Sequence, residues 1–327
     1  MNDEIDRILI NAAEEIRRII KPHLGYLKSA LSHYNTYHDT QSLGRALSHL
    51  QQIDRLLQGT RESTQALEPL QRAAYSSLRH DIAQPIFSIM GYLELIQNDK
   101  ATKTRNWPKI ETAMRTMETW LSIDTQADVP LINIAGGSYE LFHGNYGEID
   151  AQIIGRHEKK VHTVYSTAVR RIYQAMHNAT KAAREDVPIQ IRLIPSIDGD
   201  YGVIAVQDNG TGMNPEAILA SARASGYTGT PATLYDTLAL VLDIDTRQQL
   251  TGVSGFRQTH KNGNGVGLTS SALAIRGGEP VDLETTIEQE GKLLTINREH
   301  PNGYDAGKQT TGTTFRFYFP LTQTANG

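Results

Sequence analysis

The sequence predicts an α+β protein: a helical N-terminal region and a helical hairpin, followed by an α/β-sandwich domain. The first third of the chain is poor in glycine and proline, and its apolar residues recur every three or four positions, which is typical of amphipathic helices. From about Val129, glycine becomes frequent and short β-rich runs alternate with helical segments. A length of 327 residues also corresponds to about two domains rather than one.

Residues 1–62 are predicted to form two amphipathic helices. The first is expected to end near Pro22 and Gly25, because proline and glycine are poor residues for a helix interior. The second is expected to end at Gly59. No residue pattern in this region names a ligand, so its role, sensory or other, stays open.

Residues 63–128 are predicted to form an antiparallel helical hairpin. A continuous apolar stripe predicts its first helix over residues 63–98, and Trp107-Pro108 opens the second, since proline is favoured in the first helical turn. A hairpin of this length cannot bury its own apolar stripe. We therefore expect a homodimer, in which a second copy completes a four-helix bundle.

Composition excludes several classes of protein. The chain has 32 Lys and Arg against 36 Asp and Glu, a net charge of −4, which argues against nucleic acid as a partner. It has no cysteine, which excludes disulfides, thiolate metal sites and cysteine nucleophiles. The chain begins with acidic residues, and no apolar run approaches the roughly 18 residues that a membrane span needs. We expect a soluble, cytoplasmic protein.

Two elements of the domain over residues 129–327 carry side chains suited to a nucleotide. Asn178 and Lys181 lie three residues apart on a predicted helix and so share a face, where an amide oxygen could bind Mg²⁺ and an ammonium group could meet a phosphate. Asp208 follows a predicted strand and could accept a hydrogen bond from an amino group, while Gly210 and Gly212 would let a flat ligand approach the backbone. Each element alone also suits a polar helix face or a simple turn.

A third element is rich in glycine. Gly263, Gly265 and Gly267 precede a predicted helix, and backbone N–H groups at a helix N-terminus favour an anion such as phosphate. The 49 residues between the second and third elements, 214–262, are too many for an unstructured loop and carry short helical patterns.

These elements, "HNATKAA", "DNGTGM" and "GNGVGL", with "GTTF" before the last strand, together resemble the ATP-binding fold shared by gyrase, heat-shock chaperone ATPases and histidine kinases. The resemblance implies that Asn178 binds Mg²⁺, that Asp208 reads the adenine amino group, and that the glycines of the second and third elements surround the phosphates. It adds Lys181 as a phosphate contact and Thr313, in "GTTF", as a cofactor contact. It also implies that residues 214–262 form an ATP lid.

The lid resemblance includes a phenylalanine motif, Gly255-Phe256-Arg257. Lys261 or Arg257 could reach the γ-phosphate of ATP from this segment, although either could equally be a solvated charge.

The hairpin contains "HDIAQP", which resembles the phospho-acceptor box of histidine kinases. His80 lies two residues from each of Leu78 and Ile82, which belong to the apolar stripe, so we expect His80 to face solvent. Asp81 could hydrogen-bond one ring nitrogen and act as general base, which would leave the other nitrogen free to attack a phosphoryl group. Pro85 is costly inside a helix, so its presence beside His80 is informative.

Two glutamines help to choose among the subfamilies. Gln174 stands where the gyrase and chaperone ATPases have a water-activating Glu, and an amide cannot act as a base, so transfer to a side chain is favoured over hydrolysis. Gln84, on the same helical face as His80, stands where the family usually has a residue that positions water for phosphatase activity. The sequence thus predicts an ATP-dependent histidine kinase with a response-regulator receiver domain as partner. A nucleotide-sensing scaffold and a kinase for Ser or Thr remain as alternatives.

Overall fold

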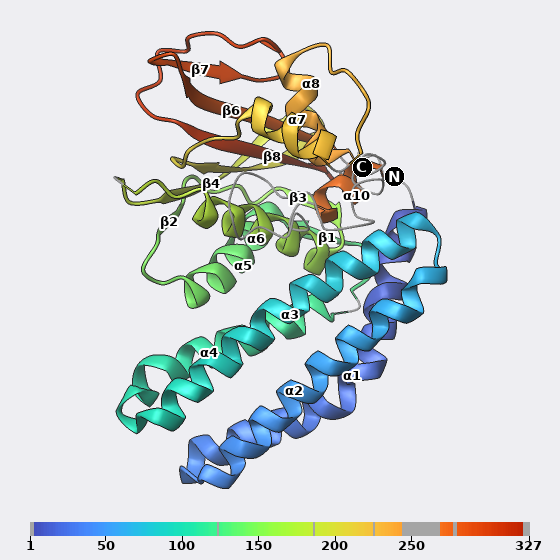
Figure 1. Ribbon diagram of the computed structural model, residues 1–327, viewed down its shortest axis with the longest axis vertical. Coiled ribbons are helices and arrows are strands. Elements are labelled where there is room, and N and C mark those ends of the chain that lie inside the picture. The colour runs from blue at the N-terminus through green and yellow to red at the C-terminus, as the bar shows by residue number, and fades with distance from the viewer. Residues whose placement is uncertain are drawn as a thin grey trace, which may run out of the picture. The chain divides into compact units, whose positions relative to one another are not determined.

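A computed structural model of the protein describes residues 3–122, 124–185, 187–224, 226–243, 269–276 and 280–322. The predicted fold class is confirmed, because helices fill the N-terminal part and a mixed sheet with helices follows (Figure 1). The chain divides into two compact units, one of residues 6–123 and one that holds the rest of the chain. Within the described residues, no helix is both long enough and apolar enough to cross a membrane.

The helical unit is a bundle of four helices that run alternately up and down (Figure 1). Its elements are α1 (Asp3–Tyr37), α2 (Thr40–Ser63), η1 (Thr64–Ala66), α3 (Pro69–Asn98), η2 (Lys100–Thr102) and α4 (Lys103–Trp120).

The predicted ends of the first two helices are wrong. Helix α1 continues through Pro22 and Gly25 to Tyr37, and α2 passes Gly59 to end at Ser63. The stripe of α1 continues beyond the proline with buried residues such as Leu27. Burial of several such side chains, each worth about 2 kcal/mol, outweighs the roughly 3 kcal/mol that proline costs in a helix interior.

The hairpin of α3 and α4 is present, with small shifts in its bounds. Helix α3 begins at Pro69, and α4 begins at Lys103 rather than at Trp107. The earlier start of α4 follows from Asp99, whose carboxylate accepts a hydrogen bond from the Ala101 N–H (2.9 Å) and so begins the turn η2 that leads into the helix.

The apolar stripe of α3 is buried within a single chain. Helices α2 and α4 pack against α3, and the Tyr75 hydroxyl of α3 donates a hydrogen bond to Glu15 of α1. The stripe is thus covered within the chain, and the expected homodimer stays a prediction. The buried residues of the stripe are Leu78, Ile82, Ile86, Ile89, Leu93 and Ile96.

The second unit is built on a six-stranded sheet in the order β2-β4-β5-β8-β6-β7, in which only the β2–β4 pair is parallel. A separate antiparallel pair joins β1 to β3. The strands are β1 (Ala127–Pro130), β2 (Asp150–Ile153), β3 (Lys160–Thr163), β4 (Gln190–Asp198), β5 (Tyr201–Asp208), β6 (Val281–Gln289), β7 (Lys292–Ile296) and β8 (Gly312–Pro320). The helices are α5 (Leu131–Asn145), α6 (Tyr165–Lys181), α7 (Pro215–Ala224), α8 (Leu234–Ala239), η3 (Leu240–Leu242) and α10 (Thr269–Arg276).

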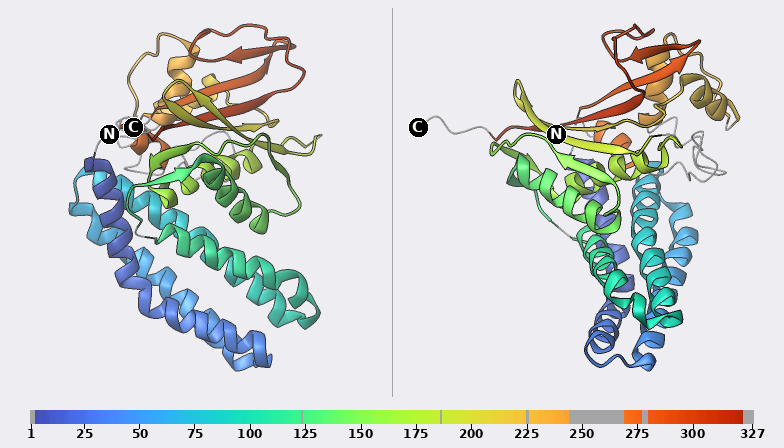
Figure 2. Two further views of the ribbon diagram at one scale, coloured as in Figure 1. Left: turned by 180° about the vertical axis from the view of Figure 1, so that it is seen from behind. Right: turned by 90° about the vertical axis from the view of Figure 1, so that its left-hand side faces the viewer.

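Helices α5 and α6 lie along one face of this sheet (Figure 2). The core of the unit lies between these two helices and the sheet. In β8, Phe315 and Phe317 are buried and pair with Val206 and Ile204 of β5, so these four side chains share one face. Alternate phenylalanines of β8 therefore form part of the core.

Candidate active site

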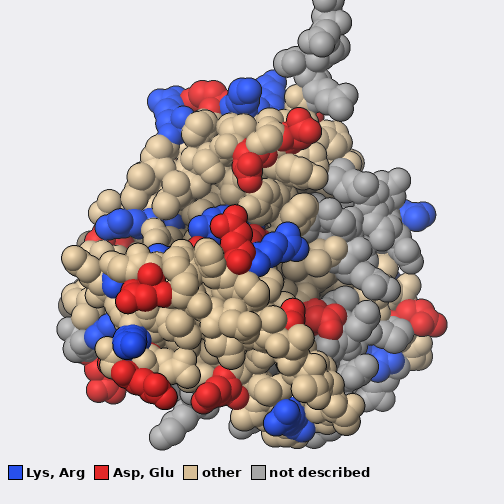
Figure 3. Space-filling model, turned by 90° about the horizontal axis from the view of Figure 1, so that it is seen from above, with Lys and Arg blue, Asp and Glu red and all other residues tan. Residues whose placement is uncertain are grey.

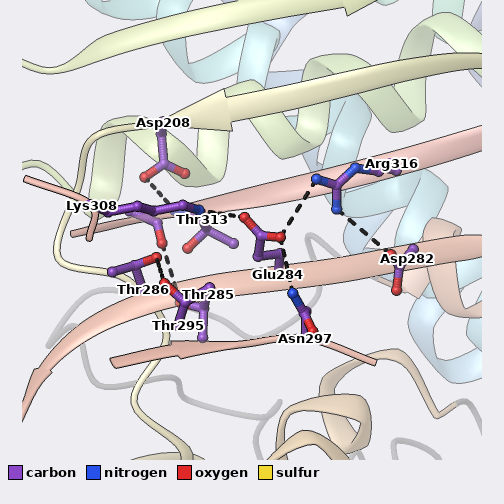
Figure 4. Close-up of polar contacts among 11 residues, drawn as sticks. Asp208, Asp282, Glu284, Thr285, Thr286, Thr295, Asn297, Lys308, Thr313 and Arg316 are labelled. Atoms are coloured by element: carbon purple, nitrogen blue, oxygen red, sulfur yellow. Dashed lines mark hydrogen bonds and ion pairs between the residues drawn. The ribbon is translucent and has the colours of Figure 1, made fainter. Parts of the chain in front are cut away.

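Asp208, the last residue of β5, is the centre of the nucleotide-site candidates. Its Oδ1 accepts hydrogen bonds from the backbone N–H groups of Gly210 (2.8 Å), in the turn after β5, and of Thr313 (3.2 Å), in β8. Figure 4 shows Asp208 beside Thr313. Burial raises the pKa of Asp208 to about 6, although both N–H donors act in the opposite direction. The site therefore holds a half-buried carboxylate that is ionised at neutral pH.

The glycines after Asp208 allow the backbone to pack closely. A Cβ on Gly210 would lie 2.5 Å from the Ala182 carbonyl oxygen. Gly212 has a positive φ of 75°, and a Cβ there would lie 2.4 Å from the Thr286 carbonyl oxygen. The protein's own backbone therefore requires glycine at both positions, besides any need of a ligand.

Two threonines, which the sequence did not single out, fix this turn in place. The Met213 N–H donates to Thr285 Oγ1 (2.7 Å), and the Thr285 hydroxyl donates to the Gly312 carbonyl (3.3 Å). The Thr311 hydroxyl donates to the Gly210 carbonyl (2.5 Å). These partners lie 72 and 101 residues apart in the chain, so no local pattern could have identified them.

Gly312 offers a direct test of this packing. Its φ is +151°, and a Cβ would lie 2.1 Å from the Asp208 carbonyl oxygen, so Gly312→Ala should lower the free energy of unfolding by about 2 to 4 kcal/mol. Gly199→Ala is the matched control, because Gly199 also has positive φ (54°) but has open space around it, and should cost about 1 kcal/mol. Urea unfolding followed by far-UV circular dichroism measures both. Equal costs for the two variants would contradict the packing described here.

The Asn178 element lies next to the Asp208 turn. The Thr211 N–H donates to the carbonyl of Ala182 (2.9 Å), the residue that caps α6. This bond brings together the first two elements that the sequence singled out. Asn178 is half-buried in the last turns of α6, and Lys181 is exposed at its end.

Helix α6 is anchored firmly at the same end. The Tyr146 hydroxyl and His177 Nδ1 form a hydrogen bond of 2.6 Å, which ties α6 to the end of α5. Gln174 is fully buried, so it belongs to the core of the unit rather than to a solvent-filled site. The orientation of Asn178 is thus set by a helix that is held on several sides.

A metal ion beside Asn178 would have few ligands from the protein and would take the others from phosphate and water. Among the described residues, no group of three or more His, Asp or Glu side chains is arranged to bind a metal ion. Mg²⁺ in nucleotide sites is bound through one or two protein oxygens together with phosphate oxygens and water, and the amide oxygen of Asn178 fits that pattern.

The third element lies outside the described residues, as do the phenylalanine motif and Lys261; its glycines are Gly263, Gly265 and Gly267. In the described part of the predicted lid, short helices are present as expected, namely α7, α8 and η3. Helix α8 begins with a capping box, in which Thr233 and Asp236 bond each other's backbone N–H groups.

The phospho-acceptor candidates lie on α3 in the helical unit. The side chain of His80 is 20 % exposed, and that of Asp81 is 1 % exposed. The expectation that His80 faces solvent therefore holds only in part, because Ser77 and Asp81 are buried beside the apolar stripe and widen the buried face of α3. Gln84, one turn further on, is half-buried.

His80 and Asp81 contact each other directly. His80 Nδ1 lies 3.4 Å from Asp81 Oδ1, at the long end of hydrogen-bond range. When Nδ1 carries the proton and donates to Asp81, the Nε2 lone pair is available to an electrophile.

Outside the candidate site, charge is mixed. On the face of the molecule in Figure 3, the described Lys and Arg side chains alternate with Asp and Glu, without a broad patch of one sign. On β6 and β8, Arg316 Nη2 lies 3.6 Å from Glu284 Oε2, and Glu284 also accepts a hydrogen bond from Lys308 (Figure 4). This network neutralises charge on the sheet. Because side chains alternate along β8, Arg316 lies on the face of the sheet opposite to Phe315 and Phe317.

The chain was also compared with known families, curated proteins and solved structures. Residues 165–323 match the family of histidine kinase-, DNA gyrase B- and HSP90-like ATPases. A mycobacterial sensor histidine kinase, MprB, is similar in structure at 15% identity and a TM-score of 0.39, over 60% of this chain and 98% of that chain. An Acinetobacter baumannii histidine kinase, AdeS, is similar at 10% identity and a TM-score of 0.35, over 75% of this chain and 98% of that chain. Among curated proteins, none matches the chain in sequence.

Proposed function

We propose that the chain is an ATP-dependent histidine kinase that phosphorylates its own His80, and the match of residues 165–323 to the family of histidine kinase-, DNA gyrase B- and HSP90-like ATPases supports this proposal. The observation that carries the proposal is the contact of His80 Nδ1 with Asp81 Oδ1 on a helix of the same chain. An ATPase domain alone is compatible with hydrolysis or nucleotide sensing, whereas a paired imidazole is a nucleophile for phosphoryl transfer.

The chemistry assigns a role to each part. Asp208 would accept a hydrogen bond from the adenine amino group, and Asn178 would hold Mg²⁺, which would offset charge on the phosphates. Asp81 accepts the Nδ1 proton of His80, so that Nε2 attacks the γ-phosphorus. The Nε2–P bond forms as the bond from phosphorus to the β,γ-bridging oxygen breaks, and ADP leaves.

The environment of Gln174 supports transfer to a side chain over hydrolysis. Gln174 is fully buried, and an amide cannot accept a proton from water at neutral pH. Transfer of the γ-phosphoryl group to a side chain of the protein therefore explains these residues better than hydrolysis of ATP by water does.

We further propose a response-regulator receiver domain as the partner that takes the phosphoryl group from His80. Phe87 and Leu95 are 55 % and 51 % exposed, although both are large and apolar. They lie 7 and 15 residues beyond His80 and so extend from it along the same side of α3, and Gly91 between them has open space around it. Exposed apolar residues in line with a phospho-acceptor suit a docking surface for the protein that receives the group.

Phe87→Ala should slow phosphoryl transfer to a receiver domain by about 10-fold or more, because it removes a large apolar contact, and should leave labelling of the kinase itself unchanged. Tyr26→Ala is the control, since Tyr26 is 62 % exposed on α1 and lies on a different helix. Transfer from the labelled kinase to a panel of purified receiver domains measures the effect. Equal transfer by both variants would remove Phe87 from the docking surface.

The proposal as a whole is tested by incubating the purified protein with γ-labelled ATP and Mg²⁺, followed by acid and alkali treatment of the labelled chain. We expect label that is labile in acid and stable in alkali, as a phosphohistidine is, and Asn178→Ala should lose it. Acid-stable label would indicate a kinase for Ser or Thr. No label despite measurable ATP binding would indicate a nucleotide-sensing scaffold.

A further inference from the structure

A cavity of about 840 Å³ lies against the six-stranded sheet, and the proposed kinase function does not use it. Strands β5, β6 and β8 form its floor through Val203, Asp282, Glu284, Arg316 and Tyr318. Because side chains alternate along a strand, Arg316 and Tyr318 lie on the face of the sheet opposite to Phe315 and Phe317. The volume lies within the range of roughly 300 to 1,000 Å³ that is typical of small-molecule sites.

The cavity is separate from the nucleotide-site candidates. Strand β5 begins at Tyr201, which lines the cavity, and ends at Asp208, which is the centre of the candidate site. Seven residues of strand separate the two, a distance of about 23 Å at roughly 3.3 Å per residue. A molecule in the cavity would therefore not compete directly with ATP.

Carboxylates on the floor of the cavity have acceptor capacity to spare. Arg316 lies between Asp282 and Glu284, and each of its ion-pair distances is 3.6 Å, which is too long for a hydrogen bond (Figure 4). Asp282 Oδ1 accepts a hydrogen bond from the Tyr235 hydroxyl (3.0 Å), which holds the side chain in place. Among the described residues, none donates a hydrogen bond to Asp282 Oδ2, so this oxygen can accept one from a ligand.

The lining of the cavity carries an excess of negative charge. Five carboxylates face two guanidinium groups, a net charge of −3, and Lys308, which bonds Glu284 from outside the lining, reduces this to −2. The carboxylates are those of Asp198, Asp200, Asp282, Glu284 and Glu299, and the guanidinium groups are those of Arg298 and Arg316. The pKa of Tyr318 is raised, first by burial and then by Asp282 and Asp198, which reflects the negative potential around its hydroxyl. Such a hollow attracts cations and repels anions.

Aromatic and apolar groups lie beside these charges. The rings of Tyr201 and Tyr318 meet edge to face, with centres 6.0 Å apart, and both tyrosines line the cavity together with the buried Val203. Ile275 adds an exposed apolar side chain at the end of α10. The face of an aromatic ring attracts a cation, and the apolar side chains suit a hydrocarbon body attached to that cation.

We propose that this cavity binds an organic cation, in which an ammonium or guanidinium group is joined to an apolar body. The charged group donates to Asp282 Oδ2, and the apolar body lies against Tyr318 and Val203. This binding site is additional to the proposed kinase function and does not rest on it.

Titration calorimetry of the full-length chain at low salt tests the charge preference. The cations are tyramine, agmatine and spermidine, and the matched anion is 4-hydroxyphenylacetate, which has the ring of tyramine with a carboxylate in place of the ammonium group. We expect at least one cation to bind about 10-fold or more tightly than the anion, and 0.5 M salt to weaken that binding. Binding of none of the three cations, or equal binding of cation and anion, would overturn the proposal.

Two variants of β6 locate the site. Asp282→Asn removes the charge but keeps an oxygen for the Tyr235 hydroxyl, and should weaken binding of the cation by about 10-fold or more. Glu288→Gln is the matched control, because Glu288 is an exposed residue of the same strand outside the lining, and should bind the cation as the wild type does. The ATP affinity of Asp282→Asn should equal that of the wild type, which also shows that the variant is folded. Equal cation affinity in both variants would place the cation elsewhere and overturn the proposal, whatever the outcome of the kinase assay.

Discussion

Asp208→Asn is expected to weaken ATP binding by about 100-fold while it stabilises the nucleotide-free protein. The asparagine can still accept the Gly210 and Thr313 N–H groups, but its NH₂ group would meet the adenine amino group donor to donor. Loss of a hydrogen bond to a charged acceptor costs about 1.5 to 3 kcal/mol in binding.

The gain in stability follows from the pKa of Asp208. Burial raises the pKa of Asp208 to about 6 from its ordinary value of 3.8, so between these values the folded protein binds more protons than the unfolded chain. Stability conferred by the neutral carboxyl is therefore lost as the pH rises through this window, and at pH 7 the ionised group costs about 3 kcal/mol at most. Asp208→Asn removes that cost, and the difference from wild type should shrink towards pH 4.

Isothermal titration with ATP and urea unfolding at pH 4 to 7 measure the two effects. Asp200→Asn is the control, because Asp200 is an exposed residue of the turn between β4 and β5 and should change neither quantity. The wild type should also bind ATP more tightly as the pH rises through about 6. Unchanged ATP affinity in Asp208→Asn would remove Asp208 from the adenine site.

His80→Gln should abolish phosphoryl incorporation, by more than about 1000-fold, and leave the affinity for ATP unchanged. Glutamine keeps a polar side chain on α3 but has no nitrogen lone pair that attacks phosphorus. Asp81→Asn should lower the rate by about 100-fold or more, since it removes the base that takes the Nδ1 proton.

His33→Gln is the matched control for the acceptor. His33 is also a helical histidine of the same unit, and its Nδ1 lies 3.8 Å from a carboxylate oxygen of Asp39. Full labelling of His33→Gln beside unlabelled His80→Gln, with equal far-UV spectra, is the expected result. Residual labelling of His80→Gln at the wild-type rate would place the acceptor elsewhere in the chain.

Much of the fold could be predicted because it follows from local patterns. The three-to-four-residue spacing of apolar side chains predicted the helices of the N-terminal part, and short β-rich runs from about Val129 predicted a sheet. The ends of α1 could not be predicted, because Pro22 and Gly25 are helix breakers in isolation and only packing against the rest of the bundle lets the helix continue. The same packing covers α3 from within the chain, which a pattern on α3 alone cannot reveal.

The candidate site shows the same limit. Asp208 and its glycines could be identified from a strand followed by a turn, whereas Thr285 and Thr311 are brought to that turn by the pairing of β6 and β8. The partial burial of His80 has a similar cause. The spacing of apolar residues predicts the apolar stripe of α3, but it does not predict that polar residues beside the stripe are buried as well.

The central claim is that this chain moves the γ-phosphoryl group of ATP to one imidazole. The most direct measurement is to incubate the wild type with Mg²⁺ and ATP, digest it at neutral to alkaline pH, and map the modification by electron-transfer fragmentation. We predict a phosphoryl group on His80 and on no other histidine. A phosphoryl group on a Ser, Thr or different His, or an unmodified chain that nevertheless binds ATP, would contradict the account.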